Sequence, residues 1–322
     1  MENSPNPANW ERNVLEKLAS EALNEQKRAR RSRTIMSLLW LTFFVVIFLA
    51  FIGGMGGKRD VSSTEKHTAL VELKGVISSD SKASGDKVIS ALQAAFKDKN
   101  TVGVVLRINS PGGSPVQSGY INDEIKRLRS KYKDIPMYVV VQDICASGGY
   151  YIAVAADKIY VDKASIVGSI GVLMDGFGFT GTMDKLGVER RLITAGANKG
   201  FMDPFSPANA EQQKYAQQMV GEIHQQFINV VKQGRGKRLK ETPEMFSGLV
   251  WSGEKSVELG LADGLGSLDS VARDVVKAEQ IVDFTADESF SEQLARRFGT
   301  TAAESFFNGI MSSSFANRAA IR

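Results

Sequence analysis

Two short runs decide how this chain folds: Asn109-Ser110-Pro111-Gly112-Gly113 and Ala146-Ser147-Gly148-Gly149-Tyr150-Tyr151. Each run follows an apolar, β-branched segment, residues 102–108 before the first and 137–141 before the second, and each leads into a stretch with helical periodicity. The sequence therefore predicts two strand-to-helix turns in one sheet. Paired glycines at such turns permit positive φ angles and allow backbone N–H groups to point at a ligand.

The same alternation continues on both sides of these turns. Apolar runs predict strands over residues 68–77, 102–108, 137–141 and 158–161, and helical spacing predicts helices over residues 84–97, 117–132, 147–156 and 210–233. Strands that alternate with helices are typical of an α/β domain with a mainly parallel sheet.

Ser147 lies at the apex of the second turn and is a candidate nucleophile. A serine hydroxyl is a weak nucleophile unless a neighbouring base accepts its proton. The chain contains 2 histidines, His67 at the start of the domain and His224 within the long helix, and neither adjoins a glycine turn. A Ser-His-Asp triad is therefore disfavoured, and lysine is the remaining common base.

A lysine that acts as a base must lose its charge, so its surroundings must lower its pKa from about 10.4 towards neutrality. Lys199 has a suitable sequence context, because the loop over residues 195–202 contains no acidic residue before Asp203. A plain surface-loop lysine is the alternative interpretation of the same context. Cys145, two residues before Ser147, is a less favoured nucleophile, since no histidine stands nearby in sequence. One cysteine and two histidines also exclude a zinc site of the usual His/Cys type.

Residues 35–52 contain no charged side chain, and they follow a basic cluster over residues 27–33. An apolar run of this length predicts a retained membrane anchor, because a cleaved signal peptide has a shorter apolar core of ~7–15 residues. The basic cluster predicts a cytoplasmic N-terminus and an extracytoplasmic domain after about Gly56. The formal net charge of +4 is concentrated in this cluster, which has no interleaved aromatic residues, so no nucleic-acid partner is expected.

Four motifs together resemble the signal peptide peptidase A family, also called protease IV. They are residues 107–113, residues 146–151, Gly168-Ser169-Ile170-Gly171-Val172 and Gly196-Ala197-Asn198-Lys199, and the resemblance extends over residues 68–283. Members are membrane-bound Ser-Lys proteases with the core fold of Clp protease and the crotonases. The resemblance implies that Ser147 is the nucleophile, that Lys199 is the general base and that Ser169 orients Lys199. It also implies an oxyanion hole formed by the backbone N–H groups of Gly113 and Gly148. Asn198 departs from the family pattern, which places an aromatic residue or histidine before the lysine.

The resemblance further implies a domain organisation and a biological role. We expect a cytoplasmic segment over residues 1–33, a transmembrane helix over 34–55, a tether over 56–67, a Ser-Lys peptidase domain over 68–285 and an amphipathic or flexible tail over 286–322. The expected substrates are cleaved signal peptides and other extended hydrophobic peptides, at the outer side of the bacterial cytoplasmic membrane. No cofactor or metal is expected, and the family forms homo-oligomers whose active sites are shared between adjacent subunits.

Three alternatives stay open at this stage. A crotonase-type acyl-CoA enzyme would use the same fold and oxyanion hole but would need neither Ser147 nor an anchor. A membrane-anchored scaffold without activity would not react with a serine-directed covalent inhibitor. A related protease that cuts stomatin-type membrane proteins would use the same Ser-Lys dyad.

Overall fold

The computed structural model describes residues 7–55 and 64–286. The described residues divide into two units, one of residues 7–55 and the other of residues 64–286. The predicted tail over residues 286–322 lies outside the described residues except for its first residue.

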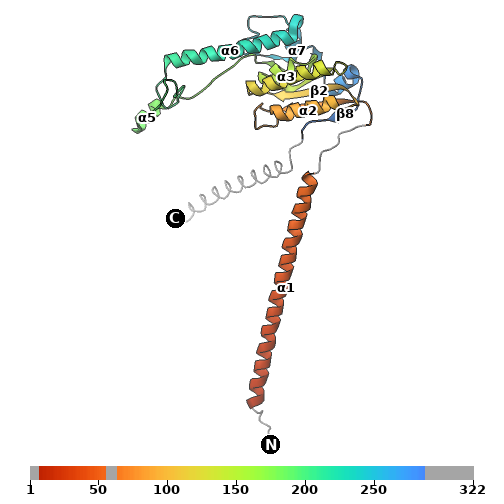
Figure 1. Cartoon of the computed structure of the whole chain (residues 1–322), viewed down its shortest axis with the longest axis vertical. Coiled ribbons are helices and arrows are strands. Elements are labelled where there is room, and N and C mark those ends of the chain that lie inside the picture. Colours follow the sequence, from red (N-terminus) through yellow and green to blue (C-terminus); the bar gives the residue numbers. More distant parts are fainter. Residues whose placement is uncertain (1–6, 56–63, 287–322) are drawn as a thin grey trace, which may run out of the picture. The chain divides into compact units, whose positions relative to one another are not determined.

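The first unit contains one long helix, α1 (Pro7–Met55), drawn in red and orange in Figure 1. The helix is continuous through Arg33, so the predicted cytoplasmic segment and the predicted transmembrane segment form one element. Within the described residues, Glu16–Phe48 is the stretch that is long and apolar enough to cross a membrane. Its large apolar side chains, such as Leu41 and Phe48, are exposed, which suits contact with lipid.

The second unit alternates strands and helices, as the sequence predicts. Its strands are β1 (His67–Lys74), β2 (Thr101–Ser110), β3 (Met137–Ala146), β4 (Lys158–Val161), β5 (Ile166–Gly168), β6 (Val250–Ser252), β7 (Gly264–Leu265) and β8 (Ile281–Asp283). Its helices are α2 (Gly85–Lys97), α3 (Pro115–Lys131), α4 (Gly148–Ala153), α5 (Thr180–Leu186), α6 (Ala210–Arg235), α7 (Gly253–Glu258) and α8 (Leu268–Ser270), with a 3₁₀ turn at Gly236–Arg238 and a π-helical turn at Val271–Val276.

The strands form one sheet in the order β6-β5-β3-β2-β1-β8, and β4 and β7 extend it from the first half of β3. All described pairs are parallel except β5 with β6. This arrangement confirms the predicted α/β class with a mainly parallel sheet. Because parallel strands end at the same edge, the turns after β2 and β3 meet there.

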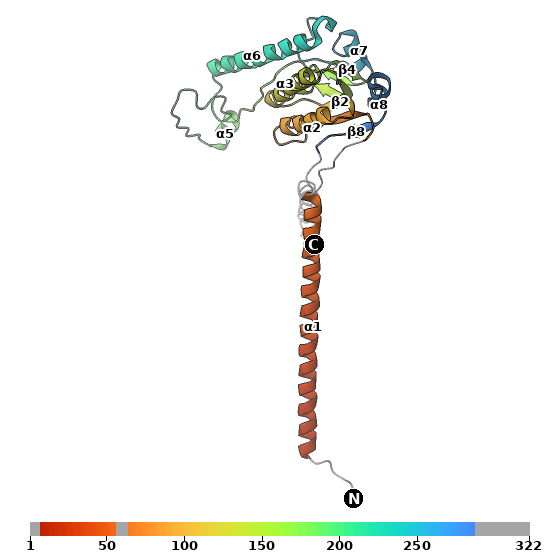
Figure 2. The same ribbon diagram turned by 45° about the vertical axis from the view of Figure 1, so that its right-hand side comes forward.

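Helices cover one face of the sheet, and the larger part of the hydrophobic core lies on that face. In both Figure 1 and Figure 2, α2 and α3 lie next to each other along the sheet, and α6 lies beyond α3. Alternate residues of β2 divide between the two faces: Leu106 and Ile108 belong to the main core, and Val105 belongs to a smaller cluster on the other face. This alternation is the period-two pattern of a strand that is buried on both faces.

Two details differ from the sequence-based expectation. The third strand continues to Ala146 instead of ending at Val141, because residues 144–146 pair with β5. His67, assigned to the tether from sequence, is instead the first residue of β1 and is completely buried. Its Nδ1 lies 3.0 Å from the carbonyl oxygen of Glu65, and its Nε2 lies 3.3 Å from Thr101 Oγ1. These polar contacts allow the imidazole to be buried at the edge of the core.

Residues 171–209, between β5 and α6, form an exposed arm that stands away from the sheet in both views (Figures 1 and 2). The arm has internal order: the Phe179 N–H donates to the Pro204 carbonyl at 2.8 Å, and the rings of Phe179 and Phe205 stack with centroids 5.4 Å apart. It nevertheless leaves large apolar side chains in solvent, including Leu173 at 80% and Ile193 at 95% exposure.

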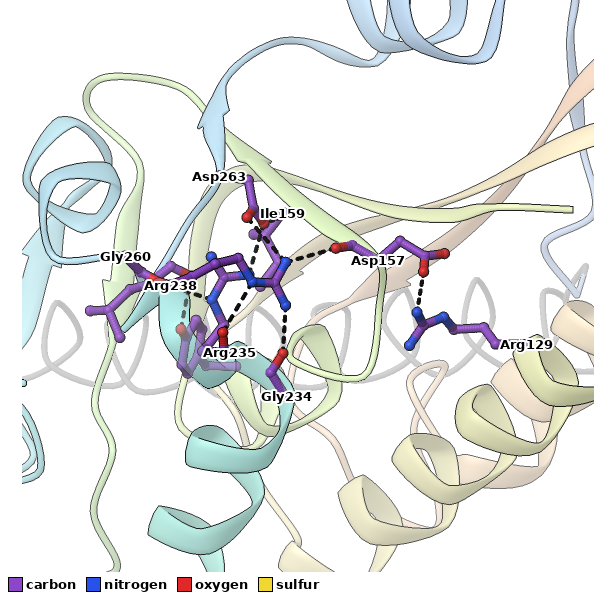
Figure 3. A network of polar contacts seen from close by, with 10 residues as sticks. Arg129, Asp157, Ile159, Gly234, Arg235, Arg238, Gly260 and Asp263 are labelled. Carbon is purple, nitrogen blue, oxygen red and sulfur yellow. Dashed lines mark hydrogen bonds and ion pairs between the residues drawn. The ribbon is translucent and has the colours of Figure 1, made fainter. Parts of the chain in front are cut away.

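A buried ion-pair network fixes the C-terminal end of α6 (Figure 3). Arg235 is 1% exposed, and it donates to Asp263 Oδ2 at 2.7 Å and to the Gly260 carbonyl at 2.8 Å. Asp263 also accepts from the Ile159 N–H at 2.7 Å and from Arg238 at 3.1 Å. Burial alone would raise the pKa of Asp263, but the hydrogen bond and charge of Arg235 outweigh it and hold that pKa below its usual range.

Asp263→Asn is expected to lower the free energy of unfolding by about 3–5 kcal/mol, because it leaves the Arg235 charge buried without its partner. Since the folded pKa of Asp263 is lowered, its contribution is complete above the unfolded value of about 3.9 and is lost as the pH falls through the lower folded value. Urea denaturation across this pH range measures both effects. Asp274→Asn is the matched control, because Asp274 pairs with Arg273 on the surface. An equal loss of unfolding free energy in both variants would contradict the view that the buried Arg235–Asp263 pair stabilises the fold more than a surface pair does.

Candidate active site

Ser147 occupies the sharp turn between β3 and α4, where it is the N-cap residue of the helix. Its backbone has φ 50° and ψ −122°, a conformation that costs a residue with a Cβ on the order of 1–3 kcal/mol. The side chain is half-buried, and its hydroxyl does not cap the helix. The turn therefore holds the Ser147 hydroxyl away from the backbone bonds that a serine usually makes at this position.

The turn after β2 lies directly against Ser147. Gly112 and Gly113 have φ angles of 103° and 148°. A Cβ on Gly112 would lie 2.7 Å from the Cβ of Ser147, and a Cβ on Gly113 would overlap the carbonyl oxygen of Ile77. Both positions therefore require glycine on two grounds, the backbone angle and the lack of space.

The N–H groups of Gly113 and Gly148 are free to bind an anion. The Ile77 N–H donates to the Gly112 carbonyl at 2.9 Å and the Ser114 N–H donates to the Ile77 carbonyl at 2.8 Å, a pattern that bypasses the Gly113 N–H. Gly148 is the first residue of α4, where a helix leaves its N–H groups without partners. A Cβ on Gly148 would lie 3.3 Å from the Gly113 nitrogen, so the two amides are neighbours. In the described part of the chain neither amide has an acceptor.

Three buried polar residues support these turns and were missed by the sequence analysis: Ser110, Ser118 and Asn122. Ser110 Oγ accepts from the Gly112 N–H at 3.1 Å, and Asn122 Nδ2 donates to the Tyr151 carbonyl at 2.7 Å. Ser118 Oγ lies where a Cβ on Gly148 would come within 2.5 Å of it. Ser118 and Asn122 fall at helical spacing with the buried Ile121 and Ile125, so their place on the inner face of α3 was a signal available in the sequence.

Ser169 follows the end of β5 beside the Ser147 turn. It also has a positive φ of 52°, and its N–H donates to the Leu249 carbonyl at 2.8 Å. The preceding residue, Gly168, accepts from the Ser147 N–H at 2.8 Å. The structure thus brings Ser147, Gly113, Gly148 and Ser169 into one region at the carboxyl edge of the sheet.

Lys199 is the predicted site residue that the single chain does not bring to Ser147. It lies in the exposed arm, its side chain is exposed, and its amine makes no hydrogen bond or ion pair with any described residue. Asp203, the next acid in the loop, is engaged elsewhere: it accepts from Ser206 Oγ at 2.6 Å and from Arg190 at 2.9 Å. These hydrogen bonds, with the Arg190 charge, outweigh its partial desolvation and lower the pKa of Asp203. Within residues 7–55 and 64–286, Lys199 thus has no carboxylate in an ion pair with it.

Other side chains near the turn are structural. Cys145 is completely buried, and burial raises the pKa of its thiol far above its ordinary value, so the thiolate is suppressed. Tyr150 is buried and donates to the Leu261 carbonyl at 2.8 Å. Across residues 7–55 and 64–286, no group of three or more His, Cys, Asp and Glu side chains is placed to hold a metal ion.

Comparison with known proteins gives a peptidase family and several relatives named as proteases. The sequence profile described as peptidase family S49 matches residues 129–283. The putative protease slr0021 of Synechocystis sp. is 32% identical over 206 residues, which are 64% of this chain and 72% of that protein. The putative signal peptide peptidase SppA of Enterococcus faecium is 34% identical over 200 residues, which are 62% of this chain and 58% of that protein.

A further match has a different name. The Na(+)/H(+) antiporter NhaA of Brucella melitensis biotype 1 is 47% identical over 182 residues, which are 56% of this chain and 25% of that protein. The chain thus spans a quarter of that antiporter and little more than half of the Enterococcus protein. An alignment to one quarter of a protein does not transfer the name of the whole protein.

Proposed function

The chain belongs to peptidase family S49, and from this premise we propose that it is a membrane-anchored serine endopeptidase with a Ser147–Lys199 dyad. One observation carries the proposal: the strained Ser147 turn holds its hydroxyl beside the N–H groups of Gly113 and Gly148, and these groups have no partner among the described residues. A nucleophile and two neighbouring donors are the parts that acyl transfer needs.

The reaction follows from these parts. Ser147 Oγ attacks the peptide carbonyl carbon, and its proton passes to the neutral amine of Lys199. The carbonyl oxygen becomes an oxyanion that accepts from Gly113 and Gly148, and each such donor is worth roughly 10²–10³ in rate. The C–N bond then breaks as Lys199 returns the proton to the leaving amine. Water, deprotonated by Lys199, hydrolyses the acyl-enzyme and regenerates Ser147. In this scheme the Ser169 hydroxyl orients the Lys199 amine.

Covalent labelling tests the proposal directly. A fluorophosphonate added to the full-length chain is expected to modify Ser147, because this reagent requires an activated serine beside an oxyanion hole. Peptide mass mapping identifies the labelled residue. Labelling of a different serine would contradict the proposal, and so would the absence of any labelling in protein that is folded and assembled.

The active site is completed by a second copy of the chain. Two observations support this part of the proposal. Lys199 is exposed and has no partner among the residues that the structure describes, and the arm that carries it has internal contacts yet exposes Leu173, Phe177 and Ile193. Exposed apolar surface of this kind is typical of a protein–protein interface. In a homo-oligomer, the arm of one subunit would bury these side chains against its neighbour and place Lys199 in the desolvated setting that a neutral amine requires.

We propose that the substrates are cleaved signal peptides and other extended apolar peptides that lie near the membrane. The name of the Enterococcus protein supports this substrate class. A membrane protein cut near its lipid-embedded segment, as in stomatin-type cleavage, would reach the same dyad, and profiling of membrane-derived peptides distinguishes the two. No cofactor enters the proposed mechanism.

We propose that the domain lies outside the cytoplasm of a bacterial cell. The basic cluster over residues 27–33 precedes the apolar part of α1, so the positive-inside rule keeps the N-terminus in the cytoplasm. Protease added to spheroplasts is therefore expected to digest the domain and to spare the segment before Ile35. Immunoblotting with tags at both ends of α1 measures this. A protected domain would reverse the orientation and remove the access to substrate.

A further inference from the structure

His224 is a polar residue on the inner face of α6, where the buried residues are apolar except for Arg235 at the end of the helix. Ala216, Phe227 and Val231 on this face are buried, and His224 is half-buried between them. Its Nε2 atom lies 3.1 Å from the carbonyl oxygen of Ile170. Ile170 is completely buried and directly follows Ser169.

The chemistry of this contact fixes which atom carries the proton. A carbonyl oxygen can only accept a hydrogen bond, so the Nε2 atom of His224 must donate. We call this hydrogen bond, from His224 Nε2 to the Ile170 carbonyl, the clamp.

The clamp completes a set of three bonds on three successive residues. Gly168 accepts from the N–H of Ser147 at 2.8 Å, Ser169 donates to the Leu249 carbonyl at 2.8 Å, and Ile170 accepts from His224. Because β5 ends at Gly168, the carbonyl of Ile170 lies beyond the strand ladder. Ser169 is held at a positive φ, and such strain persists only where the surroundings fix the backbone from several sides.

The position of His224 is itself fixed by the packing of α6 against α4. Further along α6, the rings of Phe227 and Tyr151 lie 5.2 Å apart, and Gly234 touches the Val154 carbonyl so closely that a Cβ would overlap it. The network of Figure 3 then fixes the end of the helix through Arg235. Since Ser147 is the N-cap residue of α4, the packing of α6 against α4 connects the helix that carries His224 to the Ser147 turn.

We propose that His224 is a positioning residue: through the Ile170 carbonyl it holds Ser169 at the angle from which the Ser169 hydroxyl orients Lys199. This inference rests on the proposed function. The competing explanation is a purely structural role, in which His224 only donates a hydrogen bond to a buried carbonyl. The two explanations differ in whether the loss of catalytic rate in a His224 variant depends on the Ser169 hydroxyl.

A mutant cycle in the full-length, assembled protein separates these explanations. Hydrolysis of a fluorogenic apolar peptide gives kcat and KM for His224→Leu, His224→Gln, Ser169→Ala and the double variant His224→Leu/Ser169→Ala. We expect His224→Leu to lower kcat about tenfold with KM unchanged, on the scale of one lost hydrogen bond. His224→Gln should recover most of the loss, because its amide nitrogen can donate. In the Ser169→Ala background, His224→Leu should have no further effect.

Val231→Ala is the matched control, because it removes buried volume from the same face of α6 and should lower the unfolding midpoint while kcat stays unchanged. A tenfold loss that persists in the Ser169→Ala background, or an unchanged kcat in His224→Leu, would overturn the inference.

Hydrogen exchange of the Ser169 amide gives a readout independent of activity. It should accelerate in His224→Leu and not in Val231→Ala, and unchanged exchange in both would also overturn the inference. If the wild-type protein neither hydrolyses peptide nor labels at Ser147, the proposed function fails, while exchange still decides whether His224 holds this segment.

Discussion

Ser147→Ala is expected to reduce peptide hydrolysis at least ~10³-fold, because removal of the nucleophile removes the covalent route and leaves only the contribution of the oxyanion donors and of substrate binding. The fold and assembly should be retained, since the half-buried hydroxyl makes no capping bond in α4. Initial rates on a fluorogenic peptide measure the loss, and circular dichroism with size-exclusion chromatography confirms that the variant is folded and assembled.

Cys145→Ala is the matched control for this prediction. Cys145 lies two residues away on the same strand, but it is completely buried and its thiolate is suppressed. The rate should therefore stay close to that of the unmodified protein. Near-normal hydrolysis by the Ser147→Ala protein, or a large loss in Cys145→Ala, would assign the nucleophile elsewhere.

Lys199→Ala is expected to cost activity on a similar scale, because a serine without a base loses both proton-transfer steps. The variant should fold normally, since the Lys199 amine has no partner among the described residues. Lys185→Ala, in the same arm at the end of α5, is the matched control and should retain activity. Persistent hydrolysis by Lys199→Ala at all accessible pH values would exclude the dyad.

Mixed assemblies test whether the dyad is shared between subunits. When Ser147→Ala and Lys199→Ala chains assemble together, some boundaries join an intact serine to an intact lysine. In a closed head-to-tail ring that forms at random from equal amounts of the two variants, about a quarter of the boundaries would do so. Activity should therefore return towards this fraction, although each parent is inactive. If mixed assemblies form and remain inactive, serine and lysine come from one chain.

The alternation of apolar strands with amphipathic helices was sufficient to predict the sheet around β1, β2 and β3. The pattern fails where a strand is short or continues through polar residues. Gln142 and Asp143 mark an apparent end of β3, yet the strand continues because residues 144–146 pair with β5. The strands β5 to β8 are only two to three residues long and form through contacts distant in sequence, which local periodicity cannot detect.

Within the candidate site, too, the features that are local in sequence were predictable and those that depend on distant contacts were not. The turn at Ser147 was predictable because its glycines and the preceding strand lie next to one another in sequence. The role of Ser110 was not, because a serine at the end of a strand looks the same whether its hydroxyl faces solvent or an N–H group of the next turn. The clamp from His224 joins residues 54 positions apart, and only the packing of α6 reveals it. Lys199 stays a prediction of the sequence, because the single chain leaves it in solvent.

The lack of space at Gly112 and Gly113 also constrains how such a protein can evolve. Any side chain at Gly112 would collide with Ser147, and any side chain at Gly113 would collide with the Ile77 carbonyl. Single substitutions at either position are therefore expected to disrupt the turn. Sequence variation near the turn is therefore expected at residues that have room for it. Val76 and Val116 lie close to these contacts in sequence and are exposed. Side chains at such positions can change during evolution while the backbone of the turn that carries Ser147 stays the same.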